Sequence, residues 1–433
     1  MSERPDNIKC LFPLHVILRT PMPRCWLIFL ITSANFFLSQ FYRATNAVIA
    51  GHLLNDLSLD TQGLGTLSAA FFYAFALTQI PISIFLDRIG PRRMMTGLSL
   101  VGIGGALLFS MAHSQAMGVL GRVLLGVGMA CNLMGTLKLL TVWFGPSSFA
   151  TLTGIVFSIG TVGNMAATTP LVFLVNVIGW RDAFMVIACI NLLLVIALYL
   201  VVRDTPPSNG LSAQPEGQSS GTNRAFAGLA LLLKKRDYWI ISVGSLVSYG
   251  IYAAFQTLWA GPYLMEVMGQ SDMNTGHLIF LMNLGAIAGG PLWGALSDRV
   301  LMTRKWVVSG GLLVLVLVMS VMAALPITTG FGVLLVLFFG FGLFRSSSLL
   351  MYVHIRETMP IEMAGTAMTG INFFTMIGPA FFLQGLGIFM QTLYPESSRG
   401  PEAFMASFLF CACCYLIVGL LYFFTRETGG AQR

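Results

Sequence analysis

Long apolar runs separated by short polar segments dominate the chain. A helix needs about 20 mainly apolar residues to cross the hydrocarbon core of a bilayer. Twelve runs of that kind follow one another, at 26–50, 64–86, 94–112, 116–143, 151–174, 183–202, 238–260, 275–297, 306–325, 331–353, 367–390 and 403–425. The pattern therefore predicts an all-α membrane protein with 12 transmembrane helices.

The basic residues in the connecting segments predict the orientation of these helices. If the N-terminus lies in the cytoplasm, the cytoplasmic segments hold 18 of the Lys and Arg residues, and the external loops hold only Arg181 and Arg399. Cytoplasmic loops of membrane proteins are enriched in Lys and Arg. We therefore expect both termini to be cytoplasmic.

The longest connection divides the chain into two groups of six helices. It is rich in Pro, Gly, Ser and Gln, which is typical of a flexible linker. The predicted parts are a cytoplasmic N-terminal segment at 1–25, a six-helix bundle at 26–202, the cytoplasmic linker at 203–237, a second six-helix bundle at 238–425 and a cytoplasmic tail at 426–433.

Two sequence pairs indicate that the halves are repeats of each other. LDRIGPRR at 86–93 returns as LSDRVLMTRK at 296–305, and ATLTG at 150–154 returns as TAMTG at 366–370. Both pairs recur at nearly the same spacing, which is the mark of an internal duplication. We expect two six-helix pseudo-repeats.

Composition narrows the functional classes. Charged residues make up 9% of the chain, apolar residues make up 56%, and the mean hydropathy is +0.80. The net charge of +7 therefore reflects the basic residues in the predicted cytoplasmic segments, and we expect no nucleic-acid partner. The cysteines show no loop spacing typical of disulfides or metal cages, and no nucleophile-base pair or phosphate loop occurs. We expect no enzyme, no metal site and no cofactor.

The loop after the second apolar run resembles a signature of the major facilitator superfamily. The first copy of this signature is matched by Asp87, Arg88, Gly90, Arg92 and Arg93. The second copy is matched by Gly294, Asp298 and Arg299, and the family's span-four pattern is matched by Arg122, Gly126 and Gly128. The resemblance covers essentially the whole chain and implies secondary transport by alternating access in a bacterial inner membrane or a compartment derived from it. Gly160 and Gly163 in span five suit close helix packing.

The resemblance also implies conformational roles. Asp87 follows the end of span two, and we expect it to face the N-terminus of a neighbouring helix, where an anion is stabilised. Arg88, Arg92, Arg93, Asp298 and Arg299 are expected to act as gating residues when the cytoplasmic side is shut. Arg122 is expected to have a structural or conformational role.

Basic residues inside the apolar runs suggest the charge of the solute. Arg43, Arg122, Lys138 and Arg345 lie within spans, and the acidic residues fall in loops or at helix ends. An arginine at mid-depth costs about 2.5–3.5 kcal/mol on insertion scales. Because no intramembrane carboxylate neutralises these groups, a transported anion is their natural partner.

A narrower resemblance supports that interpretation. An aromatic residue followed by arginine in span one is similar to the organophosphate:phosphate antiporter branch, where this arginine binds the anionic group; Arg43 is the matching position. Span seven lacks the second arginine of that branch and offers Tyr249, Tyr252, Gln256 and Trp259 instead. The predicted substrate-binding residues are Arg43, Tyr42, Lys138, Arg345, Tyr252, Gln256 and Asn372.

The leading hypothesis is a secondary transporter, by symport or antiport, for a small anionic organic solute. One alternative is a transporter of iron or another metal or metal chelate, of the type found in magnetosome membranes. Another is a transporter-like membrane sensor. The partners expected are the solute and the lipid bilayer, and the sequence is compatible with a monomer.

Overall fold

The structure is a computed structural model that describes residues 24–144, 146–205, 234–358 and 364–427. The first half contains α1 (Arg24–Ala44), α2 (Asn46–Asp56), α3 (Thr61–Ile89), α4 (Pro91–Ser110), α5 (Gln115–Met129), α6 (Asn132–Phe144), α7 (Pro146–Ala166) and α8 (Thr169–Val201). The second half contains α10 (Arg236–Ala254), α11 (Ala260–Pro262), α12 (Asp272–Ala295), α13 (Lys305–Ala323), α14 (Phe331–Arg345), α15 (Leu350–Thr358), α16 (Ala364–Leu393) and α17 (Pro401–Tyr422).

These helices confirm an all-helical membrane architecture. Within the described ranges, 11 helices are long and apolar enough to cross a membrane, and a shorter apolar helix covers Leu152–Ala166. The count of 12 spans and the side on which the termini lie stay predictions. Most of the predicted N-terminal segment, of the linker and of the tail lies outside the described residues.

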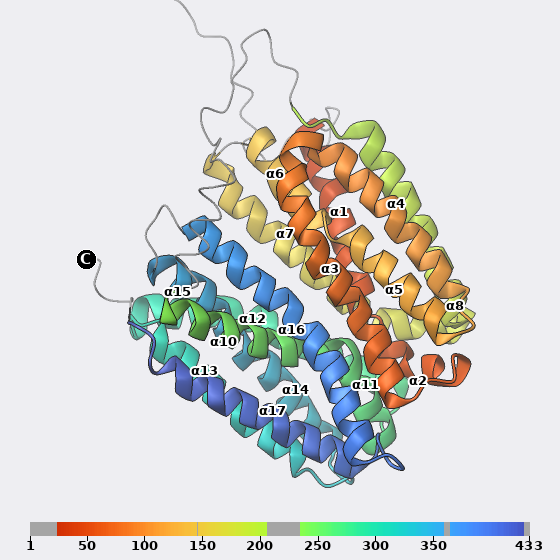
Figure 1. The fold of residues 1–433 in the computed structure, drawn as a ribbon, viewed down its shortest axis with the longest axis vertical. Helices are drawn as coiled ribbons and strands as arrows, with labels where there is room; N and C mark the ends of the chain where they lie inside the picture. Colours follow the sequence, from red (N-terminus) through yellow and green to blue (C-terminus); the bar gives the residue numbers. More distant parts are fainter. Residues whose placement is uncertain (1–23, 145, 206–233, 359–363, 428–433) are drawn as a thin grey trace, which may run out of the picture.

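The helices form two bundles that lie side by side, α1–α8 and α10–α17 (Figure 1). In the first bundle α1 packs on α7, α3 on α5 and α4 on α8. In the second bundle the pairs are α10 with α16, α12 with α14, and α13 with α17. The same order of helix pairing therefore occurs twice along the chain.

Glycines bring the paired helices into backbone contact. A Cβ atom on Gly163 of α7 would lie 2.3 Å from the carbonyl oxygen of Phe37 in α1. In the second half, a Cβ atom on Gly378 of α16 would lie 2.3 Å from the carbonyl oxygen of Leu246 in α10. The packing role predicted for Gly163 is confirmed, and its counterpart in the second half is Gly378.

Gly179 separates two helical segments within α8. Its φ of 80° and ψ of 161° lie outside the helical region, in a conformation that glycine adopts without steric cost. The next two side chains, Trp180 and Arg181, both donate hydrogen bonds to the carboxylate of Asp56 at the end of α2. The Arg181 guanidinium also donates to the carbonyl oxygen of Ala112, at 2.9 Å. Arg181 therefore links α8 both to Asp56 at the end of α2 and to Ala112, which follows α4.

Asp56 gives the fold an expected dependence on acid. The hydrogen bond from Trp180, followed by that from Arg181, holds the pKa of the Asp56 carboxyl below its ordinary value of 3.8. A carboxyl whose pKa is lowered by folding contributes stability above its unfolded pKa and loses it as the pH falls through the folded value. Asp56→Asn is expected to lower the free energy of unfolding by about 1 kcal/mol at pH 7, since the pair is partly in solvent.

The measurement is the melting temperature of both proteins between pH 7 and pH 3. The gap between wild type and Asp56→Asn should be constant above about pH 5 and close below about pH 4. A gap that does not depend on pH would show that the charge of Asp56 contributes nothing.

The two bundles meet more closely at one end than at the other. We call the end that holds α2 and α11 the α2 end, and the end where α8 stops and α10 starts the linker end. Figure 1 shows α3 running beside α16, while α6 and α7 lie well apart from α15 at the linker end. Thr61 at the start of α3 bonds to Ser398 at 2.6 Å, and the Tyr73 hydroxyl donates to Gln384 of α16 at 3.0 Å. Both bonds lie toward the α2 end.

The α2 end is also closed by direct backbone packing. A Cβ atom on Gly261 in α11 would lie 2.0 Å from the carbonyl oxygen of Ala47 in α2. A Cβ atom on Gly65 would lie 2.7 Å from the carbonyl oxygen of Leu383. Any side chain at these positions would push the bundles apart.

Candidate functional site

Four helices, two in each bundle, depart from regular α-helical geometry within their length. The α1 helix ends at Ala44 before α2 begins, and the α5 helix ends at Met129 before α6 begins. The α10 helix passes into a π-helical turn, Phe255–Trp259, and the α14 helix passes into a 3₁₀ turn, Ser346–Leu349. Such interruptions mark functional sites in helical membrane proteins, because they free backbone and side-chain groups from the regular helix.

Arg43 lies in the last turn of α1, directly before the first of these breaks. Only 5% of its surface is exposed. Its Nη1 donates a hydrogen bond to the hydroxyl of Tyr249 on α10, at 2.9 Å. The guanidinium carbon is 5.7 Å from the ring centre of Phe72 and 5.0 Å from that of Phe75. Arg43 therefore reaches from the first bundle to the second and is held against aromatic faces.

Arg345 approaches the same tyrosine from α14. It is the last residue of that helix, where the helix dipole favours a cation, and it is 9% exposed. Its guanidinium carbon lies 4.8 Å from the ring centre of Tyr249 and 4.7 Å from that of Tyr252. Within the described part of the chain, Arg345 has no hydrogen bond or ion pair, and its buried Nε has no acceptor. We call Arg43, Tyr249, Tyr252 and Arg345 the two-arginine site.

The two-arginine site combines three of the predicted residues with one that the sequence analysis did not select. Arg43, Tyr252 and Arg345 were predicted substrate-binding residues, and the structure brings them together around Tyr249. Tyr249 was noted only as a span-seven aromatic residue in place of an arginine. The available signal was that Tyr249 lies in span seven, where the resemblance led us to expect a second arginine.

Arg122, on α5, contacts the end of α1 beside the two-arginine site. It is 1% exposed, and its Nη1 donates to the carbonyl oxygen of Tyr42, at 3.0 Å. That carbonyl precedes Arg43 and lies at the end of α1, where helical donors are missing. The Arg122 guanidinium also lies 4.9 Å from the ring centre of Phe71. This geometry fits a positioning residue that holds the end of α1.

The other predicted substrate-binding residues lie elsewhere. Tyr42 is fully buried inside the first bundle, with its ring 6.1 Å from that of Phe184. Gln256 donates to the side-chain oxygen of Asn283 on α12. Asn372 accepts a hydrogen bond from the hydroxyl of Tyr352, at 3.2 Å. The Nζ of Lys138 lies 3.4 Å from the carbonyl oxygen of Leu86, near the linker end.

The predicted gating residues lie at the linker end. Among them, Arg92 is held within the first bundle: its backbone N–H donates to Asp204 at 2.7 Å, and its Nε donates to the carbonyl oxygen of Tyr199 at 2.9 Å. Gly90 makes room for this contact, because a Cβ atom there would lie 2.5 Å from the Asp204 carboxylate. The side chains of Arg88, Arg93 and Arg299 are exposed, and those of Asp87 and Asp298 lie outside the described residues.

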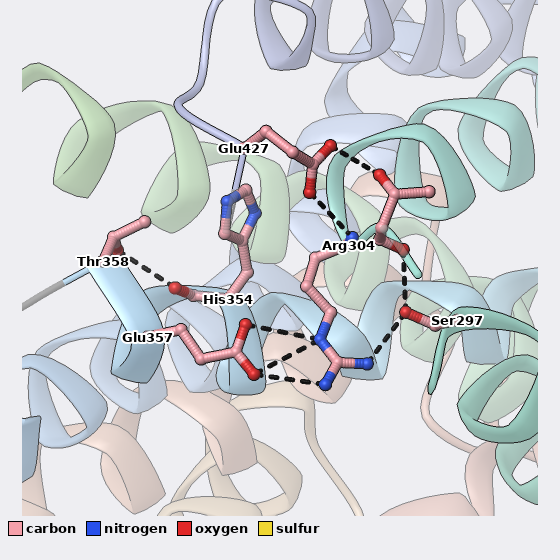
Figure 2. A network of polar contacts seen from close by, with 7 residues as sticks. Ser297, Arg304, His354, Glu357, Thr358 and Glu427 are labelled. Atoms are coloured by element: carbon pink, nitrogen blue, oxygen red, sulfur yellow. Dashed lines mark hydrogen bonds and ion pairs between the residues drawn. The ribbon is translucent and has the colours of Figure 1, made fainter. Parts of the chain in front are cut away.

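The second half has an equivalent acidic contact (Figure 2). Glu427 accepts hydrogen bonds from the hydroxyl of Thr303 and from the backbone N–H of Arg304, the latter at 3.1 Å. Arg304 also pairs with Glu357 at 3.1 Å and donates to the hydroxyl of Ser297 at 2.8 Å. Asp204 and Glu427 each follow the last helix of their half, and each binds the start of the third span of that half. The sequence signal was the repeated pair Arg-Asp at 203–204 and Arg-Glu at 426–427.

A further pair of contacts repeats beside these acids. The indole N–H of Trp143, at the end of α6, donates to the carbonyl oxygen of Arg203 at 2.9 Å. In the second half, the Nε2 of His354 in α15 contacts the carbonyl oxygen of Arg426 at 2.8 Å. His354 is fully buried, and its Nδ1 lies 2.7 Å from the hydroxyl of Tyr422.

The paired bundles, interrupted central helices and buried arginines are those of a helical membrane transporter. A model of the Major Facilitator Superfamily matches residues 28–383, and the protein belongs to this family. It is a multi-pass integral membrane protein with the family and fold of transporters.

Relatives and solved structures give a consistent picture. A probable sulfoacetate transporter of Cupriavidus necator is 26% identical over 272 residues. The match covers 61% of this chain and 63% of the relative, so somewhat less than two thirds of the relative's length is matched. A probable hexose phosphate transport protein of Chlamydia muridarum is 24% identical over 405 residues, 88% of this chain and 86% of that protein. A bacterial homologue of the human lysosomal transporter Spinster, inward-facing and unoccupied, has a TM-score of 0.75 at 19% identity, covering 93% of this chain and 97% of that one, and shares the fold.

Proposed function

We propose that the protein is a secondary transporter that moves a small anionic organic solute across a bacterial inner membrane by alternating access. The observation that carries this proposal is the two-arginine site. Arg43 and Arg345 come from opposite bundles, both are buried, and neither has an acidic partner among the described residues. A buried cation without a counter-ion is costly, so an anion that binds between the bundles is stabilised there. The named solutes of the relatives, sulfoacetate and hexose phosphate, are anions as well.

The bundle contacts support a specific conformational state. The hydrogen bonds recorded between the bundles are those of Thr61, Tyr73 and Arg43, and none lies between the two-arginine site and the linker end within the described ranges. Among the described residues the bundles are therefore joined at the α2 end and parted at the linker end. If the linker is cytoplasmic, this state is inward-facing. The gating residues of the two loop signatures would then meet only after the bundles rock.

The proposal is tested with purified protein in proteoliposomes. Labelled organic anions are expected to enter faster than into empty liposomes, and to raise the melting temperature of the detergent-solubilised protein, because only ligands of the folded state stabilise it. The matched controls are the neutral amides of the same compounds. If no anion is taken up or stabilises the protein more than its amide does, the proposal is wrong.

A further inference from the structure

Two guanidinium groups face different parts of one phenol. Arg43 lies at the hydroxyl of Tyr249, where its Nη1 donates a bond of 2.9 Å. Arg345 lies over the ring face of the same residue, with its guanidinium carbon 4.8 Å from the ring centre. Tyr249 therefore contacts both cations, and a ligand that pairs with both must reach from the hydroxyl of Tyr249 to its ring face.

The described part of the protein supplies no acidic group that balances the charge of Arg43 and Arg345. Four ion pairs are recorded within the described ranges, and all lie near helix ends and join residues of the same bundle: Arg181 with Asp56, Arg304 with Glu357, Arg399 with Glu266, and Arg426 with Asp237. None includes Arg43 or Arg345, and the buried Nε atoms of both have no acceptor among the residues that the structure describes. A solute with one charge would neutralise one guanidinium and leave the other buried and unpaired, which is unfavourable.

The surroundings of the two cations are aromatic. Phe72 and Phe75 lie beside Arg43, and Tyr252 lies beside Arg345 with its ring centre 4.7 Å from the guanidinium carbon. Such faces suit a short carbon chain, and Arg43 and Arg345 are the charged groups beside it among the described residues. The polar contacts of a ligand would therefore concentrate at its two ends.

We propose, building on the transport function above, that the two-arginine site selects a two-ended organic dianion, such as a short dicarboxylate or sulfocarboxylate. One anionic group pairs with Arg43 and the other with Arg345. Each guanidinium presents a planar fork of donors that matches an oxyanion. Because Arg43 and Arg345 belong to different bundles, the same ligand links the two halves that move.

The test compares three probes by calorimetric titration of the purified protein at pH 7.5. Succinate carries one charge at each end, glycerol 3-phosphate carries both charges at one end, and propionate carries a single charge. Succinate is expected to bind at least about tenfold more tightly than either of the others, since only succinate gives each guanidinium its own anionic group.

Arg345→Gln separates the two ends. It is expected to weaken succinate binding about 10- to 100-fold and to change propionate binding by less than about threefold, because propionate needs only Arg43. Propionate binding by the variant also shows that it is folded. Arg426→Gln is the matched control: the Arg426 side chain is 88% exposed at the far end of the second bundle, and this change should affect no probe.

The outcomes distinguish this inference from the transport function. Equal binding of succinate and propionate, or equal binding of succinate and glycerol 3-phosphate, would overturn the two-ended dianion and leave an anion transporter. An equal loss of succinate and propionate in Arg345→Gln would overturn it as well. If no probe and no other organic anion binds, both the inference and the transport function fall.

Discussion

Replacing Arg43 with glutamine is expected to abolish uptake of the anionic solute in proteoliposomes, with a fall of at least about 100-fold. The Arg43 guanidinium is buried, reaches the second bundle through Tyr249 and has no acidic partner among the described residues. A charge-assisted contact is worth about 1.5–3 kcal/mol, and the loss of two such bonds to one anion reaches this size. Glutamine removes the charge and the fork of donors, and it also removes the cost of burying a cation, so the protein should still fold.

Two further variants make this result specific. Arg43→Lys keeps the charge but loses the planar fork, and an intermediate uptake is expected. Arg426→Gln removes an exposed arginine remote from the two-arginine site and should transport normally. Uptake is measured at equal protein content, with circular dichroism to verify the helices. Near-normal uptake by Arg43→Gln would rule out an anion site at this residue.

Substituting Gly261 with alanine is expected to open the α2 end and to reduce uptake about tenfold. The added Cβ atom would lie 2.0 Å from the carbonyl oxygen of Ala47 and 2.9 Å from its carbonyl carbon. The obstacle is backbone, so no side chain can turn away. Overpacking of this kind costs about 1–3 kcal/mol, and separation of the bundles relieves it. The equilibrium between shut and open states should shift by about 5- to 150-fold.

Accessibility of the α2 end measures this shift. Thr61 and Ser398 bond across the bundles there, so a cysteine at 398 reports on closure. A membrane-impermeant thiol reagent should label Ser398→Cys faster in the Gly261→Ala background than alone. Gly51→Ala is the matched control, because Gly51 lies in α2, the helix that Gly261 packs against, and a Cβ atom there meets nothing within 4 Å. Unchanged labelling together with normal uptake in Gly261→Ala would contradict a gate at this contact.

Arg43 was predictable from the sequence because a charge in an apolar run has few explanations. Arg345 was predictable for the same reason. Tyr249 was not selected, because an aromatic residue in a membrane helix is usually a packing residue, and only the fold shows that its hydroxyl and its ring face two cations. Tyr42 was predicted as a substrate-binding residue because it is adjacent to Arg43 in sequence. Its side chain instead points into the first bundle toward Phe184. Neighbouring residues on a helix face different directions.

The membrane helices followed from the length and apolarity of the runs, but their interruptions did not. The break at Thr45 involves neither proline nor glycine. The carbonyl oxygen of Tyr42 there accepts from the hydroxyl of Thr45 and from the side chain of Arg122, which lies 80 positions away. Local propensity carries no record of such a partner. In contrast, Pro81 and Pro379 lie inside the continuous helices α3 and α16. Tertiary contacts therefore decide where these helices break.

The matching contacts of Trp143 and His354 make the two halves chemically unequal at the linker end. A carbonyl oxygen can only accept, so the bond to Arg426 requires the proton of a neutral His354 to reside on Nε2, which leaves Nδ1 to accept from the hydroxyl of Tyr422. An indole N–H needs no such choice. A second proton on His354 would turn Nδ1 into a donor and force the Tyr422 hydroxyl to reverse its role. The first half thus holds a residue after its last helix with an indole, which can only donate. The second half holds the equivalent residue with an imidazole, whose hydrogen-bonding role depends on where its proton lies.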